Sequence, residues 1–329
     1  MDLQRRTLRF CATLMVCAIL FRLLSGGLLG QAVKAIASPE ILSFFTYLET
    51  GKVVRPTLDP EVTTPSTEPT QPSTSPDLPV FAPVDAALVS VNNTCGYTYD
   101  MESLLQSPLS WELASDQPTV LILHSHGTES YTPTEEYTES SDYRTLDTGY
   151  NVVSIGEKVA GLLEGNGIQV IHDKTLHDHP SYSNAYNSAR TSIQHYLDQY
   201  PSICLVLDIH RDAVTDKSGN QLGYTIDVNG EKAAQLMFVS GTDASGLSHP
   251  LWQENLSLAA KLHAQLEKNN PGICRPISFR SQRFNQDLSA GALIVEVGAA
   301  GNTRQEALAA VELLGQAIID LSHGTASCE

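Results

Sequence analysis

The sequence is poor in basic residues. Lysine and arginine together number 20, against 37 aspartates and glutamates, and the formal net charge of the 329-residue chain is -17. Because duplex nucleic acid is bound by clustered lysine and arginine side chains, this balance argues against a nucleic-acid-binding role. The length leaves room for one large domain or two small ones once an anchor and a linker are set aside.

Closely spaced cysteine pairs are also missing. The six cysteines lie at positions 11, 17, 95, 204, 274 and 328, and no two of them form the CxxC pairing of a structural zinc site. Cys204 falls in an apolar segment, where we expect a small buried hydrophobe. The four cysteines beyond the N-terminal apolar run could form disulfides outside the cytoplasm, but the sequence indicates no particular pairing.

The N-terminus lacks an uninterrupted apolar stretch of the roughly 20 residues that a spanning helix needs. Arg5, Arg6 and Arg9 precede an apolar run over residues 10–21, which continues past Arg22 to about residue 30. A positive flank followed by an apolar run is typical of a signal peptide or a signal anchor. We predict an uncleaved single-pass membrane anchor over residues 1–38, with a cleaved signal peptide as the alternative. Both place the rest of the chain outside the cytoplasm.

The remainder divides by composition into a linker and a domain. After a short juxtamembrane segment (39–54), residues 55–83 are rich in Pro, Thr and Ser, which predicts an extended linker. Residues 84–324 form the predicted catalytic domain, in which short apolar runs alternate with helical patterns. Strands are expected at 119–123, 168–171, 203–209, 235–239 and 292–297, and helices at 151–164, 185–200, 251–268 and 303–321. This alternation predicts an α/β fold with a mostly parallel sheet flanked by helices.

Polar side chains follow three of these predicted strands. His124 and His126 come directly after the first strand with Glu129 close behind, His210 follows the third, and Glu296 lies near the end of the fifth. Ligands of open α/β sheets bind beyond the carboxyl ends of the strands, so these side chains are expected to converge. Imidazole and carboxylate groups are zinc ligands, and three of them leave a position for water. The spacing is not a contiguous HExxH motif, and each histidine alone is more often an ordinary hydrogen-bonded residue.

Four ordered blocks of the sequence resemble a known family. They are LILHSHGTESYTPTEEY, YRTLDTGYNVVSIGEKVAGLLE, LVLDIHRDA and ALIVEVGAAGN, and they match in order the blocks of the stage II sporulation protein P family. That family is related to the zinc-dependent N-acetylmuramoyl-L-alanine amidases of bacterial cell walls. The resemblance covers residues 84–322. It implies a protein of the mother-cell membrane in a spore-forming bacterium, facing the septal wall during engulfment of the forespore.

The resemblance also implies roles for individual residues. His126 and His210 correspond to zinc-binding histidines, and Glu296 corresponds to the catalytic glutamate. The wider amidase pattern places a third ligand, a glutamate, just ahead of the helix that follows the first loop. Asp147 occupies that place here, and we predict it as the third ligand. Glu129 is the alternative, placed second because a residue three positions after His126 in a tight turn is expected to point elsewhere.

Three further residues are predicted to bind substrate or to support the zinc ligands. His124 would orient a ligand, as partners behind a metal site commonly do. Glu129, if it is not a ligand, would orient one or contact substrate. Arg211 would bind a carboxylate of a stem peptide or form an ion pair with Asp212. Residues 182–187 follow the second strand and could line the substrate groove.

The resemblance implies zinc-dependent hydrolysis of the amide bond between N-acetylmuramic acid and the first L-alanine of the stem peptide, with Glu296 as the base. It further implies action on cross-linked stems and partnership with a sporulation lytic transglycosylase and an associated membrane protein. Two alternatives stay open: a zinc endopeptidase or carboxypeptidase acting only on stem peptides, and a non-catalytic wall-binding scaffold. A buried Glu296 disfavours the scaffold, because an unpaired buried carboxylate is costly unless it has a function.

Overall fold

The computed structural model describes residues 85–109, 113–135, 137 and 142–322. All of them belong to the second of two compact units, Ser73–Glu329. The predicted anchor (1–38), juxtamembrane segment (39–54) and linker (55–83) lie outside the described residues. Among the helices that the structure describes, none is long and apolar enough to cross a membrane.

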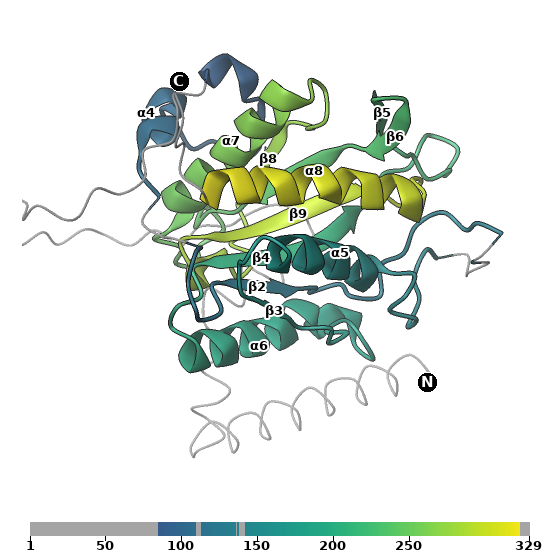
Figure 1. Ribbon diagram of the computed structural model, residues 1–329, viewed down its shortest axis with the longest axis horizontal. Coiled ribbons are helices and arrows are strands. Elements are labelled where there is room, and N and C mark those ends of the chain that lie inside the picture. Colours follow the sequence, from purple (N-terminus) through teal and green to yellow (C-terminus); the bar gives the residue numbers. More distant parts are fainter. Residues whose placement is uncertain (1–84, 110–112, 136, 138–141, 323–329) are drawn as a thin grey trace, which may run out of the picture. The chain divides into compact units, whose positions relative to one another are not determined.

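A seven-stranded sheet forms the centre of the described unit (Figure 1). Its strands are β1 (Val91–Asn93), β2 (Val120–Leu123), β3 (Val170–His172), β4 (Leu205–Asp212), β7 (Leu236–Ser240), β8 (Ile277–Phe279) and β9 (Ala292–Ala299). They lie in the order β1-β8-β7-β9-β4-β2-β3, and neighbours are parallel except for the antiparallel pair β7 and β9. The predicted mostly parallel α/β sheet is therefore confirmed.

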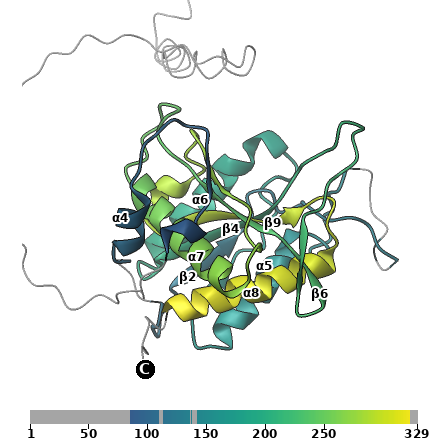
Figure 2. The same ribbon diagram turned by 90° about the horizontal axis from the view of Figure 1, so that it is seen from above.

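Helices cover both faces of this sheet (Figure 2). The helices are α4 (Met101–Gln106), α5 (Val152–Glu164), α6 (Ala185–Gln199), α7 (Trp252–Asn269) and α8 (Arg304–Ser322), with short 3-10 turns at Ala86–Leu88, Tyr182–Asn184 and Gln286–Leu288. One set of alternating strand residues, including Ile122, Leu207 and Val295, packs against α5, α7 and α8. The other set, including Leu121 and Val206, packs against α6. The sheet thus has an α6 face and an opposite face that carries the larger core.

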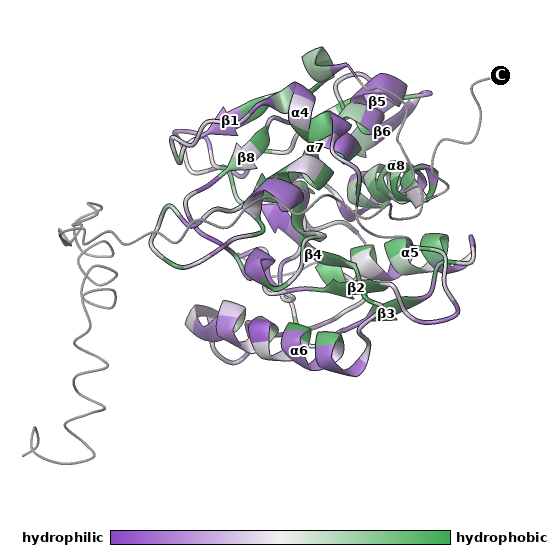
Figure 3. Cartoon of the chain, turned by 90° about the vertical axis from the view of Figure 1, so that its left-hand side faces the viewer, coloured by the Kyte–Doolittle hydropathy of each residue, from purple (hydrophilic) through white to green (hydrophobic). Residues whose placement is uncertain are grey.

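Helix α5 shows why the local sequence folds this way. Asn151 begins the helix by accepting a hydrogen bond at 3.0 Å from the backbone N–H of the second helical residue. Val152, Ile155, Val159 and Leu163 follow at helical spacing and are fully buried. Burying each such side chain contributes roughly 1.5–3 kcal/mol. Figure 3 shows how hydrophobic and hydrophilic segments are distributed: β2 is hydrophobic, and α6 carries mainly hydrophilic segments.

The expected strands and helices are confirmed to within a few residues at their ends. The elements that were not predicted include the edge strand β1, its neighbour β8, helix α4, and a hairpin of β5 (Thr225–Val228) and β6 (Glu231–Ala234) outside the main sheet. Strands β1 and β8 have only three residues each, VNN and ISF, and neither forms a continuous apolar run that would indicate a buried strand. Their positions depend on pairing with distant segments rather than on local sequence.

Candidate metal centre

The candidate site lies on the α6 face of the sheet, where β4 and β9 are neighbours. Side chains alternate along a strand, so Asp208 and His210 share the face of Val206, which packs against α6. His210 is directly opposite Glu296 of β9 in the strand register. The sheet therefore places a histidine and a glutamate side by side, as the predicted strand ends required.

His126, Glu129 and His210 form a group whose potential ligand atoms all lie within 4.8 Å of one another. Glu129 Oε1 is 3.7 Å from His126 Nδ1, and Glu129 Oε2 is 3.4 Å from His210 Nδ1. His210 and Glu129 are buried, whereas His126 is partly exposed. Two imidazoles and a carboxylate, open to solvent on one side, are a donor set that fits a zinc ion with a free coordination position.

The loop after β2 brings His126 and Glu129 together. The backbone N–H of Glu129 donates to the carbonyl oxygen of His126 at 3.1 Å, so the two residues are the first and last of one turn. Asp178 holds the middle of this turn, because it accepts from the Thr128 N–H at 3.1 Å and from the Thr128 hydroxyl at 2.5 Å. A closed turn places its ends close together, which is why residues three apart can face one centre.

Asp147, predicted as the third ligand, lies outside this group. Its side chain is exposed and accepts a hydrogen bond from the Gly149 N–H at 2.9 Å, as expected for a turn residue ahead of a helix. Glu129, the alternative, is the carboxylate beside both histidines. The expectation that Glu129 would point elsewhere failed because the turn closes on itself through the hydrogen bond to His126.

Arg211 supports the site from behind rather than lining it. Its Nε donates to the Ser130 carbonyl oxygen and its Nη2 to that of Tyr143, both at 2.9 Å, and Nη1 lies 3.6 Å from Glu129 Oε1. The side chain is only 4 % exposed. Asp212 pairs instead with Arg275 at 2.8 Å, and the Arg211 guanidinium faces backbone carbonyls and Glu129. Its contact with a stem-peptide carboxylate stays a prediction.

His124 faces away from the histidine–glutamate group. Its Nδ1 is 2.9 Å from the Ile209 carbonyl oxygen and its Nε2 is 2.9 Å from His172 Nε2. A carbonyl oxygen only accepts, so Nδ1 carries the proton and His124 Nε2 accepts from His172. Burial and the neighbouring His172 lower the pKa of His124 to about 3, which keeps the ring neutral. Its role is to link β2 to β4 rather than to touch a predicted ligand directly.

Two tyrosines pack against His126 from the start of α6 and the turn before it. The Tyr182 ring stacks on the His126 ring with centroids 4.6 Å apart, and the Tyr186 ring meets it edge-on at 5.3 Å. Tyr182 is 55 % exposed. The Arg144 guanidinium lies 4.5 Å from the Tyr182 ring centre and 3.6 Å from Glu129 Oε1. These side chains lie beside His126, and Tyr182 and Tyr186 belong to residues 182–187, the segment predicted to line a groove.

Asp208 and Ser125 were not anticipated. Asp208 Oδ1 is 2.9 Å from His210 Nε2, and Ser125 donates to the same carboxylate through its backbone N–H at 2.7 Å and through its hydroxyl. The signal was present in the sequence, because Asp208 precedes His210 by two residues in a strand and must share its face. Asp208 is the first charged residue after the apolar start of this strand, Leu205–Leu207.

Ser125, His210 and Asp208 lie together without forming a nucleophilic triad. In a triad the serine and the carboxylate contact opposite nitrogens of the imidazole. Here Ser125 Oγ at 3.3 Å and Asp208 Oδ1 at 2.9 Å both face His210 Nε2, and the hydroxyl itself donates to Asp208. All three residues are buried. The arrangement supports a histidine ligand and does not activate a serine.

Burial and charge separate the two glutamates of the site. Burial opposes ionisation of Glu129, but His210 and Arg211 outweigh it and lower the pKa of Glu129 to about 2. Burial, with the Glu129 and Asp212 carboxylates, instead raises the pKa of Glu296 to about 8. Glu296 Oε2 is buried without a hydrogen-bond partner among the residues that the structure describes. The surroundings thus favour the ionised form of Glu129 and the protonated form of Glu296.

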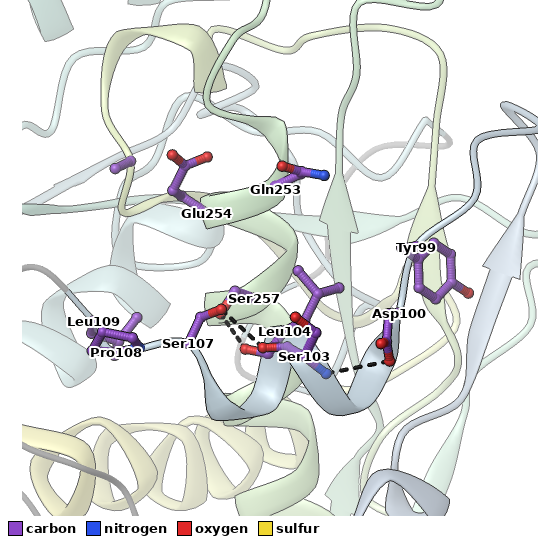
Figure 4. Close-up of a pocket in the computed structure, with 11 residues that line it drawn as sticks. Tyr99, Asp100, Ser103, Leu104, Ser107, Pro108, Leu109, Gln253, Glu254 and Ser257 are labelled. Carbon is purple, nitrogen blue, oxygen red and sulfur yellow. Dashed lines mark hydrogen bonds between the residues drawn. The ribbon is translucent and has the colours of Figure 1, made fainter. Parts of the chain in front are cut away.

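A separate pocket of about 330 Å³ lies between α4 and the start of α7 (Figure 4). Its lining includes Tyr99, Ser103, Gln253, Glu254 and Ser257, and none of its lining residues belongs to the histidine–glutamate group. The chemistry predicted from the strand ends therefore does not involve this pocket.

Comparison with known proteins matches a family model described as stage II sporulation protein P over residues 58–319, more than half of the chain. A protein of that description from Bacillus subtilis (strain 168) is 27% identical over 206 residues, 59% of this chain and 49% of the relative. The aligned part thus spans about half the length of that relative. Solved structures similar to this chain include N-acetylmuramoyl-L-alanine amidase AmiC2 of Nostoc punctiforme (16% identity, TM-score 0.40, 64% of this chain and 99% of that one). Another is the N-acetylmuramoyl-L-alanine amidase from Clostridium difficile 630 (16%, 0.38, 64% and 100%).

Proposed function

Because the chain belongs to the stage II sporulation protein P family, we propose that it is a zinc-dependent peptidoglycan hydrolase. The bond we assign to it is the amide between N-acetylmuramic acid and the L-alanine of the stem peptide. The observation that carries the proposal is the group of His126, Glu129 and His210, with Glu296 opposite His210 on the adjoining strand. Four side chains from three separate segments supply a complete ligand set and a base.

Each residue has a distinct task in this mechanism. His126, Glu129 and His210 would hold zinc, which when bound supplies Lewis-acid activation of water and of the amide carbonyl. Glu296 accepts the proton of the attacking water at its carboxylate and returns it to the leaving amine. Its buried, unpartnered Oε2 suits this exchange, and a nearby dication favours the carboxylate form from which it starts.

The cellular setting is part of the proposal. Residues 1–38 would anchor the protein in the mother-cell membrane, and residues 55–83 would carry the catalytic domain to the septal wall. Cross-linked stems would be a further substrate, and a lytic transglycosylase with its associated membrane protein would be the partners. The acidic net charge of -17 supports the absence of a nucleic-acid partner.

The test uses the full chain purified in detergent. We expect about one zinc per chain by elemental analysis, and digestion of purified sacculi that releases intact stem peptides and frees the lactyl carboxyl group. His126→Ala and His210→Ala should each lose zinc and turnover together. Release of shortened stems alone would instead identify a peptidase. A zinc-free protein without turnover would leave a wall-binding scaffold, and a zinc-free protein with turnover would disprove the metal mechanism.

A further inference from the structure

The two ring nitrogens of His210 face two different carboxylates. Nδ1 lies 3.4 Å from Glu129 Oε2, inside the group proposed to hold zinc. Nε2 lies 2.9 Å from Asp208 Oδ1, outside that group. An imidazole binds a metal only through a nitrogen without a proton, and the opposite nitrogen then carries the proton. The partner of Nε2 therefore decides which nitrogen is available as a ligand.

Asp208 is itself firmly held. Ser125 donates to Oδ1 from its backbone N–H at 2.7 Å and to Oδ2 from its hydroxyl. The Asp208 side chain is 7 % exposed, and β4 lies between β2 and β9 near the centre of the sheet. Since Ser125 stands one residue before His126, the same hydrogen bonds join the loop that carries one proposed ligand to the strand that carries another.

We infer that Asp208, held by Ser125, is a positioning residue that keeps the proton of His210 on Nε2 and presents Nδ1 to the metal. This inference rests on the proposed zinc function and names how the site is assembled. Partners of this kind fix the ring orientation and raise the basicity of the ligand nitrogen, and their loss costs 10–100-fold in metal affinity. Asp208 does not touch substrate, and it acts only through His210.

Zinc affinity of the full chain, measured by competition with a chromophoric chelator, tests this assignment. Asp208→Asn keeps the size of the side chain but removes its charge, and we expect zinc to bind 10–100-fold more weakly. Asp287→Asn is the matched control, because Asp287 is similarly buried (9 %) and is bonded at 2.8 Å by Arg190, away from the proposed ligands. The control should bind zinc as the wild type does.

Ser125→Ala provides a milder second variant if Asp208→Asn fails to fold, as judged by circular dichroism and thermal unfolding. It removes one hydrogen bond to Asp208 and should weaken zinc binding several-fold with the fold intact. A crystal structure of the zinc-loaded chain should show the metal on His210 Nδ1.

The outcomes separate the inference from the proposed function. If the wild type binds zinc and Asp208→Asn binds it with the same affinity, the positioning role is overturned and the hydrolase proposal stays intact. If Asp208→Asn does not fold, the same conclusion follows from an unchanged zinc affinity of Ser125→Ala. Zinc on Nε2 would lead to the same conclusion. A wild-type chain that binds no zinc would overturn both.

Discussion

His210 and Glu296 lie directly opposite each other on the neighbouring parallel strands β4 and β9. Met237 of β7 continues the same row across the sheet. Opposite residues of paired strands project from the same face, so the His210 and Glu296 side chains leave the sheet together on the α6 side. Backbone hydrogen bonds, rather than a flexible loop, thus set the spacing between a proposed ligand and the proposed base.

Glu296→Gln separates catalysis from metal binding. The substitution keeps the shape of the side chain but removes its ability to accept a proton, so turnover on purified peptidoglycan should fall about 10²–10⁴-fold. Zinc content should stay at the wild-type level, because Glu296 is outside the group of His126, Glu129 and His210. Equal loss of zinc and activity would make Glu296 a ligand, and unimpaired activity would remove it from the mechanism.

Glu129→Gln and Asp147→Asn decide between the two candidate carboxylate ligands. Glu129 lies between both histidines, so its loss should weaken zinc binding by more than the roughly 10–100-fold that an outer partner costs. Asp147 is exposed and bonded to the Gly149 N–H, so Asp147→Asn should bind zinc normally. Chelator competition on the two variants measures the difference. The reverse order of effects would restore Asp147 as the ligand and require the loop to rearrange around the metal.

The sequence was sufficient to predict the central strands and the convergence of His126, His210 and Glu296 at their ends. Long apolar runs such as residues 203–209 can be recognised as buried strands from the sequence. The carboxyl ends of parallel strands meet at one edge of the sheet, independently of the conformation of the loops. His126, His210 and Glu296 could therefore be selected before any coordinates. The edge strand β1 and its neighbour β8 could not, because their short segments are placed by pairing with each other and with β7.

The structure departs from the predicted site in its loop geometry, which depends on single hydrogen bonds. Whether Glu129 faces His126 depends on the turn bond between their backbones, and whether Arg211 reaches solvent depends on the carbonyls of Ser130 and Tyr143. No periodic pattern encodes such contacts. Asp208 is different, since strand alternation alone puts it beside His210, and it could have been predicted.

Gly156 of α5 is expected to tolerate no side chain. A Cβ at this position would lie 2.7 Å from His124 Cε1 and 2.8 Å from His172 Nε2, and His124 is fully buried. Gly156→Ala should therefore destabilise the fold by about 1–3 kcal/mol, as overpacking does. Gly161→Ala is the control in the same helix, where nothing lies within 4 Å of the added carbon, and it should stabilise by about 0.5–1 kcal/mol. Urea unfolding measures both, and a stabilised Gly156→Ala would contradict the packing.

Lys261 of α7 should make stability rise with pH. It is 1 % exposed, and its Nζ donates to the carbonyl oxygens of Leu104 and Leu105 at 2.7 Å, beside the Ser257 hydroxyl that also bonds Leu104 (Figure 4). Burial lowers the pKa of Lys261 from 10.5 to about 8. Between these two values the unfolded chain binds more protons than the folded one, so the Lys261 contribution to the free energy of unfolding becomes more favourable as pH rises.

Urea unfolding of the wild type and Lys261→Met at pH 7 and pH 10 tests this directly. Titration of the other groups is common to both proteins, so the difference between them isolates Lys261. At pH 10 the free energy of unfolding of the wild type should increase relative to that of Lys261→Met. The reason is that the neutral Lys261 amine keeps its hydrogen bonds to the end of α4 and no longer carries a buried charge. Lys158→Met, which removes an exposed ammonium paired with Glu312, controls for the loss of one positive charge. A difference that is equal at the two pH values would mean that Lys261 keeps its proton throughout and that water reaches its ammonium group.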